Sequence, residues 1–171
     1  MNVRKPLAAL SLVAAVASAV LAGCAAKKAD AMSPEVSKAR MIELVDRTIE
    51  ELHVSGWHEL DGGAYIQQCH LERGGSGVNY AYDAMGPASS DPNGDLQVVK
   101  TFREKSGLAT KEASLTNPNE RTLRLYGIGG DVKGINFYVD TEAMSIGAES
   151  ICVPGDHHEL VSGHATDVGG H

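Results

Sequence analysis

The chain has 171 residues, of which 15 are Lys or Arg and 22 are Asp or Glu, so its formal net charge at neutral pH is −7. An acidic chain with two Phe, one Trp and five Tyr lacks both the basic surface and the stacking platform that nucleic-acid binding requires, so no nucleic-acid partner is expected. Without its first 23 residues the chain keeps 148, which is enough for one domain with a hydrophobic core.

The N-terminal segment has the anatomy of a signal peptide. Two cations, Arg4 and Lys5, precede an apolar run from Leu7 to Val20, and small residues follow. Fourteen helical residues rise about 21 Å, which is too short for the roughly 30 Å hydrocarbon core of a bilayer. The run therefore predicts a cleaved export signal rather than a permanent transmembrane helix.

The sequence Leu21-Ala22-Gly23-Cys24 closes this segment and resembles the lipobox of bacterial lipoprotein precursors. That resemblance implies a diacylglyceryl group on the sulfur of Cys24 and cleavage before it, with palmitate among the acyl chains. We therefore expect residues 1–23 to be the signal peptide, Cys24 to be the lipidation site, and the mature protein to be held at the extracytoplasmic face of the cell membrane. The alternative is an ordinary secretory signal with a nearby cysteine.

Residues 24–32 are small and polar and predict a flexible tether before a single domain over 33–154. A helix is expected from Ser33, which suits the N-cap, with Pro34 in the first turn and Gly56 ending the helical region. Its expected core-facing residues recur at helical spacing: Val36, Ala39, Ile42, Val45, Ile49 and Leu52.

Short alternating segments follow the helix. Ala64–Glu72 and Val78–Ala84 flank the glycine-rich run Gly74–Gly77, which predicts an antiparallel hairpin. The glycines lack the lysine of a Walker loop, and the serine lacks the glycine two positions later that a nucleophile elbow needs.

A second amphipathic helix is predicted from Asp91 to Gly107, with an inward stripe that contains Leu96, Val99, Phe102 and Arg103. Four further strands are expected at Thr110–Thr116, Arg121–Gly127, Gly134–Val139 and Met144–Val153, with turns at Asn117–Asn119 and Gly129–Asp131. The predicted fold is α+β, with two helices packed on one face of an antiparallel sheet of about six strands in the order α-β-β-α-β-β-β-β.

Cys69 and Cys152 are the two cysteines that remain after Cys24, and an exported chain reaches an oxidising compartment. A disulfide between them would close a loop of 152 − 69 + 1 = 84 residues. The competing interpretation is a pair of buried thiols or metal ligands, although neither cysteine has a second ligand at zinc-finger spacing. We predict the disulfide.

The order of elements, with a cysteine in the first strand and another ending the last, resembles the small actinobacterial lipoproteins of the mycobacterial LppA type. The similarity covers roughly Cys69 to Cys152, including Gly107-Leu108 after the second helix and the Tyr126–Gly130 turn. It implies the fold and the anchor, and it supplies no catalytic residue. The histidine-containing tail departs from that pattern.

Residues 155–171 contain four of the seven histidines, interspersed with carboxylates and glycines. Imidazoles with nearby carboxylates suit zinc, nickel or copper, so His157, His158, His164 and His171 are candidate ligands. The glycines and the absence of a one-face spacing favour a disordered polar tail instead, and we predict neither a metal site nor a cofactor.

The chain contains none of the local motifs HExxH, SxxK, GxSxG or CxxC. A spatial constellation needs no local motif, and His58, His70 and Asp83 are candidates for one. We predict a non-catalytic module that binds an unidentified ligand or protein at the cell envelope. A metal-handling lipoprotein and an unrecognised envelope hydrolase are the alternatives.

Overall fold

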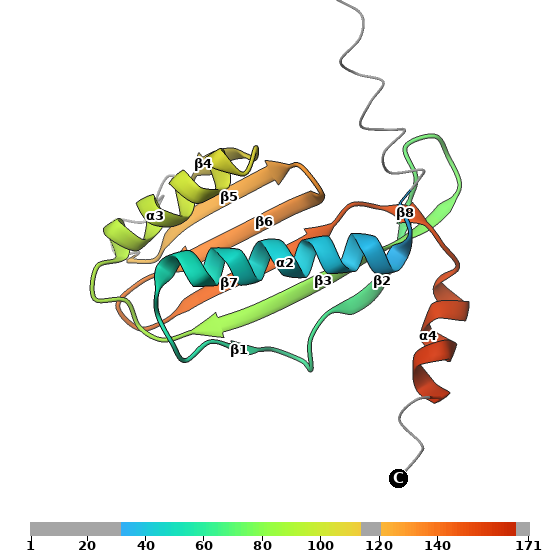
Figure 1. The fold of residues 1–171 in the computed structure, drawn as a ribbon, viewed down its shortest axis with the longest axis horizontal. Coiled ribbons are helices and arrows are strands. Elements are labelled where there is room, and N and C mark those ends of the chain that lie inside the picture. The colour runs from blue at the N-terminus through green and yellow to red at the C-terminus, as the bar shows by residue number, and fades with distance from the viewer. Residues whose placement is uncertain (1–31, 114–120, 167–171) are drawn as a thin grey trace, which may run out of the picture.

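The computed structural model describes residues 32–113 and 121–166, and these form an α+β fold. Helices α2 (Pro34–Leu52) and α3 (Pro92–Lys105) lie on the same face of one antiparallel sheet (Figure 1). The predicted fold class and the predicted order of the main elements are confirmed.

The central sheet has the strand order β1-β3-β7-β6-β5-β4, and β2 and β8 pair with β3 outside this path. Strands β1 and β8 have two residues each and were not predicted, and the predicted strand Met144–Val153 is divided into β7 and β8. The predicted Asn117–Asn119 turn lies outside the described residues. The strand bounds are β1 His58–Glu59, β2 Tyr65–His70, β3 Ser76–Gly86, β4 Ala109–Glu112, β5 Leu123–Gly129, β6 Val132–Val139, β7 Met144–Ser150 and β8 Val153–Pro154.

Helix α2 begins as predicted, because the Ser33 hydroxyl accepts the backbone N–H of Val36 at 3.3 Å. It ends at Leu52 rather than near Gly56, because His53 takes a left-handed conformation (φ 53°). The predicted buried stripe is confirmed for Val45 and Leu52, with Ile42 and Ile49 packed against the core, and it is wrong at its start, where Ala39 is exposed and Val36 is 43% exposed. The buried residues of α2 are Ser37, Met41, Val45, Thr48 and Leu52.

Two of the buried residues of α2 that the predicted stripe left out are polar, Ser37 and Thr48. The Thr48 hydroxyl donates to the carbonyl of Leu44 at 2.7 Å, and the Ser37 hydroxyl donates to that of Ile151 at 3.2 Å. Both hydroxyls therefore lose water without losing a hydrogen bond. A prediction that counts only apolar residues as core-facing misses Ser37 and Thr48.

Helix α3 carries its predicted stripe, including a fully buried Arg103. One terminal nitrogen of its guanidinium donates to the carbonyls of Leu125 and Ile135 at 3.4 Å, and the other donates to that of Asn136 at 3.3 Å. Burial lowers the pKa of this guanidinium. Arg103 thus joins α3 to the backbones of β5 and β6.

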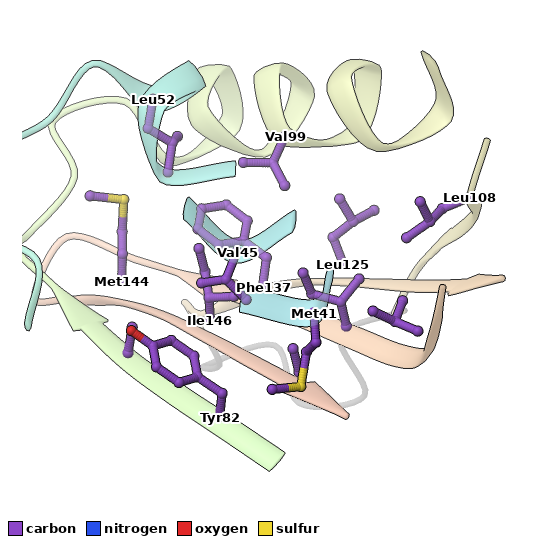
Figure 2. Packing of buried hydrophobic residues seen from close by; sticks show 14 of the residues in the cluster. Met41, Val45, Leu52, Tyr82, Val99, Leu108, Leu125, Phe137, Met144 and Ile146 are labelled. Carbon is purple, nitrogen blue, oxygen red and sulfur yellow. The ribbon is translucent and has the colours of Figure 1, made fainter. Parts of the chain in front are cut away.

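The hydrophobic core lies between the helices and the sheet (Figure 2). Met41 and Val45 of α2 meet Phe137 and Ile146 of the central strands, and Val99 of α3 completes the layer. Every second residue of β7, and of β6 from Ile135 onward, is buried, which is the pattern of a sheet with one covered face. The predicted alternation of Ile135, Phe137 and Val139 is confirmed.

The predicted disorder of residues 155–171 is wrong for its first part, because His157–Thr166 form helix α4. The Asp156 carboxylate accepts the N–H groups of His158 at 2.8 Å and Glu159 at 3.2 Å, which caps the helix. Leu160 packs on a small cluster that contains Met32, Val78 and Val153. Residues 167–171 lie outside the described part. No helix among the described residues is long and apolar enough to cross a bilayer.

Candidate functional site: the open face of the sheet

The face of the sheet opposite α2 and α3 is here called the open face. Helices α2 and α3 both pack on the other side, and the alternation of the strands turns a second set of side chains away from them (Figure 1). Strand register aligns these residues in two rows across the sheet. One row is Lys111, Tyr126, Asn136, Gly147 and Asp83, and the next is Arg124, Tyr138, Ser145, Met85 and His58.

Two tyrosines form the aromatic part of the open face. The rings of Tyr126 and Tyr138 meet edge to face, with centroids 6.3 Å apart and an interplanar angle of 85°. The Arg124 guanidinium lies 5.8 Å from the centroid of the Tyr138 ring. A hydrogen bond with Tyr126, together with partial burial, raises the pKa of the Tyr138 phenol, while Arg124 acts in the opposite direction. Tyr138 therefore keeps its phenolic hydroxyl at neutral pH, and the two rings together present an aromatic surface.

Asp83 lies over a glycine on the adjacent strand. A Cβ atom at Gly147 would be 2.6 Å from one carboxylate oxygen of Asp83, so the missing side chain leaves room for that carboxylate. Partial burial raises the pKa of Asp83, and the neighbouring charge of Asp61 raises it further. This row of the open face thus combines a carboxylate, the amide of Asn136 and a phenol.

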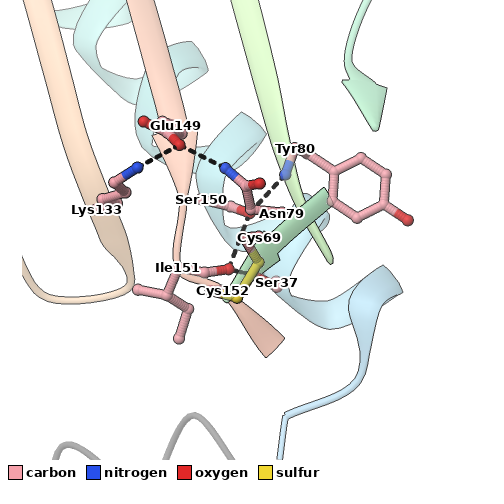
Figure 3. The surroundings of a disulfide bond; sticks show 9 residues. All are labelled: Ser37, Cys69, Asn79, Tyr80, Lys133, Glu149, Ser150, Ile151 and Cys152. Atoms are coloured by element: carbon pink, nitrogen blue, oxygen red, sulfur yellow. Dashed lines mark hydrogen bonds and ion pairs between the residues drawn. A yellow bond between two sulfur atoms is a disulfide. The ribbon is translucent and has the colours of Figure 1, made fainter. Parts of the chain in front are cut away.

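A polar network occupies the end of the open face near β8 (Figure 3). The Glu149 carboxylate accepts the Asn79 amide at 2.6 Å and pairs with the Lys133 ammonium at 2.7 Å. Asn79 is almost fully buried, so its bond to a charged partner offsets the cost of removing its amide from water. Lys133 is exposed, and its ion pair is of the kind that contributes at most about 1 kcal/mol.

The predicted disulfide between Cys69 and Cys152 is present, with Cα atoms 6.0 Å apart (Figure 3). Cys69 belongs to β2, and Cys152 directly precedes β8. These two strands are not neighbours, because β3 lies between them: Cys69 pairs with Gly77, and Gly77 pairs with Pro154 on its other side. A Cβ atom at Gly77 would be 3.0 Å from the Cys152 sulfur. The disulfide therefore crosses β3 at a residue that has no side chain.

The structure separates the residues considered for a hydrolase. His58 pairs with Met85, and His70 pairs with Ser76, nine residues away along β3. Nine strand residues span about 30 Å. Asp83 and His58 lie on the open face, whereas the register places His70 on the other face. These three side chains therefore do not form one constellation.

The candidate metal ligands of the tail lie on α4 or beyond it. The rings of His157 and His158 are perpendicular, with centroids 5.8 Å apart. The side chain of His164 and the whole of His171 lie outside the part that the structure describes. Among the residues that were described, no group of three or more His, Cys, Asp or Glu side chains is placed to hold a metal ion.

A small cleft of about 190 Å³ lies on the helix side, where α2 meets the β5–β6 turn. The Arg40 guanidinium on its wall pairs with Asp131 at 3.0 Å, and Arg47 lies 5.2 Å from the Phe102 ring. Both cations thus already have partners. The cleft is smaller than the roughly 300 Å³ typical of small-molecule sites.

The open face was not predicted as a site, although part of its signal is visible in the sequence. Tyr126 and Tyr138 alternate with Leu125 and Phe137, which places each tyrosine opposite a core residue. Alternation does not reveal strand order, and strand order is what brings the two tyrosines together. The same is true of Asp83 and Gly147.

Comparison with solved structures finds similarity to a DUF4853 family protein from Actinomyces odontolyticus. The TM-score is 0.51 at 18% sequence identity, and the match covers 72% of this chain and 69% of that one. At this identity the similarity concerns the fold alone. No protein-family model matches the chain, and no curated protein matches it.

Proposed function

We propose that this chain is a lipid-anchored lipoprotein of the extracytoplasmic face of the cell membrane, and that its domain acts there as a non-catalytic binding module. The observation that carries the location is the Cys69–Cys152 disulfide, because such bonds persist in exported proteins and are rare in the cytosol. The signal-like segment before Cys24 supports the same location.

The anchor is tested by Cys24→Ala. Lipidation requires the sulfur of Cys24, so the variant should either remain an unprocessed precursor or leave the membrane fraction. Detergent partitioning and intact mass distinguish these forms, and Ala29→Ser serves as the matched control because it changes a small residue of the same segment and leaves the sulfur of Cys24 and the disulfide in place. A Cys24→Ala protein that is processed and still partitions with membranes would refute the anchor.

The binding surface that we propose is the open face. Tyr126 and Tyr138 offer aromatic rings with polar hydroxyls, and Asp83 and Asn136 lie in the adjoining row, so the surface combines apolar contact with hydrogen bonding. The ligand class that fits is a polar envelope component with both hydroxyl-rich and apolar faces.

This surface is tested with purified cell-wall material from the source organism as the probe. Tyr138→Ala should weaken sedimentation of the protein with cell wall, whereas Val98→Ala on the exposed side of α3 should not. Val98 is 40% exposed and lies away from the open face, which makes it a suitable control. Equal sedimentation of both folded variants would exclude the open face as the binding surface.

A further inference from the structure

Met32 and the first turn of α2 are held at one end of the sheet. Met32 is buried against Val78 and Val153, and the Ser37 hydroxyl donates to the carbonyl of Ile151. The first turn of α2 is capped by Ser33. The chain therefore enters the domain through a rigid contact with β3, β8 and the end of β7.

Two other segments lie at the same end. Helix α4 attaches there, because Leu160 joins the Met32 cluster and a Cβ at Gly155 would be 3.1 Å from Pro34. The β2–β3 turn adjoins it, since Leu71 closes that turn by bonding to Gly75 at 3.1 Å next to the disulfide (Figure 1). We call residues 32–37, 71–75 and 153–162 together the anchor pole.

The connection from the anchor to this pole is short. Met32 is the eighth residue after Cys24, and eight fully extended residues span at most about 29 Å. Helix α2 alone, with 19 residues, is about 28 Å long. A lipid on Cys24 would therefore hold the pole within about one length of α2 from the bilayer.

The anchor pole also exposes apolar side chains. Val36 is 43% exposed on the first turn of α2, and Val161 is 45% exposed on α4. Transfer of exposed aliphatic side chains from water to the boundary between headgroups and acyl chains lowers the free energy. Carboxylates of the same pole, including Glu35 and Glu159, disfavour a strongly anionic surface, so charge alone would not bring the domain to a membrane.

We propose that the anchor pole rests on the lipid headgroups, with Val36 and Val161 at the interface and the strands rising away from the bilayer. This orientation rests on the lipid anchor proposed above. In this orientation the open face is perpendicular to the bilayer plane, and ligands in the envelope layer next to the membrane can reach it. The lipid on Cys24 supplies the attachment and the two valines add little to it, so the domain without its lipid is expected not to float with vesicles.

The orientation is tested with the lipidated protein reconstituted in phosphatidylcholine vesicles that contain a headgroup-level spin-labelled lipid. A fluorescent dye is attached to single cysteines in Val36→Cys, Val161→Cys and, as the control, Val98→Cys. The three valines are matched, with exposures of 43%, 45% and 40%, and α3 lies at the other end of the sheet from α4 (Figure 1). The native disulfide stays oxidised and does not react with the dye.

The expected result is loss of dye emission at positions 36 and 161 and unchanged emission at 98. Flotation of the protein with vesicles is measured in the same samples. Flotation with equal quenching at all three positions overturns the orientation while the anchor stands. Failure to float overturns the anchor, and the orientation falls with it.

Discussion

Replacing Gly77 by alanine should disturb the crossing of the disulfide over β3. Gly77 lies within β3 and has no left-handed φ, so its backbone suits any residue. By that criterion alone, alanine would stabilise the protein by about 0.4–1 kcal/mol, because it restricts the unfolded chain. The new Cβ, however, would lie 2.5 Å from the carbonyl oxygen of Val153 and 3.0 Å from both the Cys152 sulfur and a Leu71 methyl.

The size of the effect follows from what must move. The Val153 carbonyl belongs to β8, whose pairing with Gly77 and Val78 has only two residue pairs, so β8 and the sulfur shift together. Overpacking of this kind costs about 1–3 kcal/mol, which exceeds the gain from the unfolded state. If the strain also prevents the disulfide, loss of a loop closure across a separation of 83 residues adds up to about 4.5 kcal/mol.

Urea unfolding of the oxidised protein, with thiol titration to verify the disulfide, measures the cost. Gly134→Ala is the matched control, since its Cβ would only reach ordinary contact, 3.9 Å from the Gly127 carbonyl. Repeating both substitutions in the Cys69→Ala/Cys152→Ala background should reduce the cost of Gly77→Ala, because the sulfur is gone. A Gly77→Ala protein as stable as Gly134→Ala, or a cost unchanged without the cysteines, would refute this explanation of Gly77.

Three further predictions concern other parts of the fold. Deleting residues 157–171 removes Leu160 from its cluster and should lower the free energy of unfolding by about 1 kcal/mol, with the disulfide still formed. Calorimetric titration of the undeleted protein with zinc or copper should detect no submicromolar site that the deletion abolishes. Asp83→Asn should raise stability at pH 7, with the advantage shrinking as pH falls, because the raised pKa of Asp83 makes its ionised form the unfavourable one in the fold; a less stable variant at pH 7 contradicts this. Arg103→Met should cost far less than Arg103→Ala in urea unfolding, because methionine fills the volume and removes a buried charge; equal losses would show that the guanidinium hydrogen bonds dominate.

The sequence predicted the elements better than the contacts between them. Alternation located the β2–β3 hairpin and β6, and the Ser33 and Asp91 caps located the starts of both main helices. Period and capping are local properties, so a single sequence carries them. The disulfide was predictable because, once Cys24 is set aside as the predicted lipidation site, Cys69 and Cys152 leave one pairing.

Most of the features that were missed depend on contacts between residues distant in the sequence. The run Gly74–Gly77 was interpreted as one loop, but only Gly74 and Gly75 have positive φ, and Gly77 serves the disulfide crossing. Helix α4 was missed although its Asp156 cap is a local signal, because the glycines of the tail favoured disorder and the packing that supports the helix comes from Leu160, whose partners Met32 and Val78 lie far earlier in the chain. Strand order, which sets these contacts, leaves no periodic signal.

The open face is where folding and binding are most separable in this molecule. Helices α2 and α3 and the inward residues of the strands supply the core, so Phe137 or Ile146 cannot change without loss of stability. Tyr138 and Asp83 contribute little to that core, and Asp83 is held in an unfavourable ionised state. A partly buried carboxylate that weakens the fold is a cost that binding would explain, since functional sites often conflict with stability. If Asp83→Asn is more stable and also fails to sediment with cell wall, one substitution will have separated the two roles.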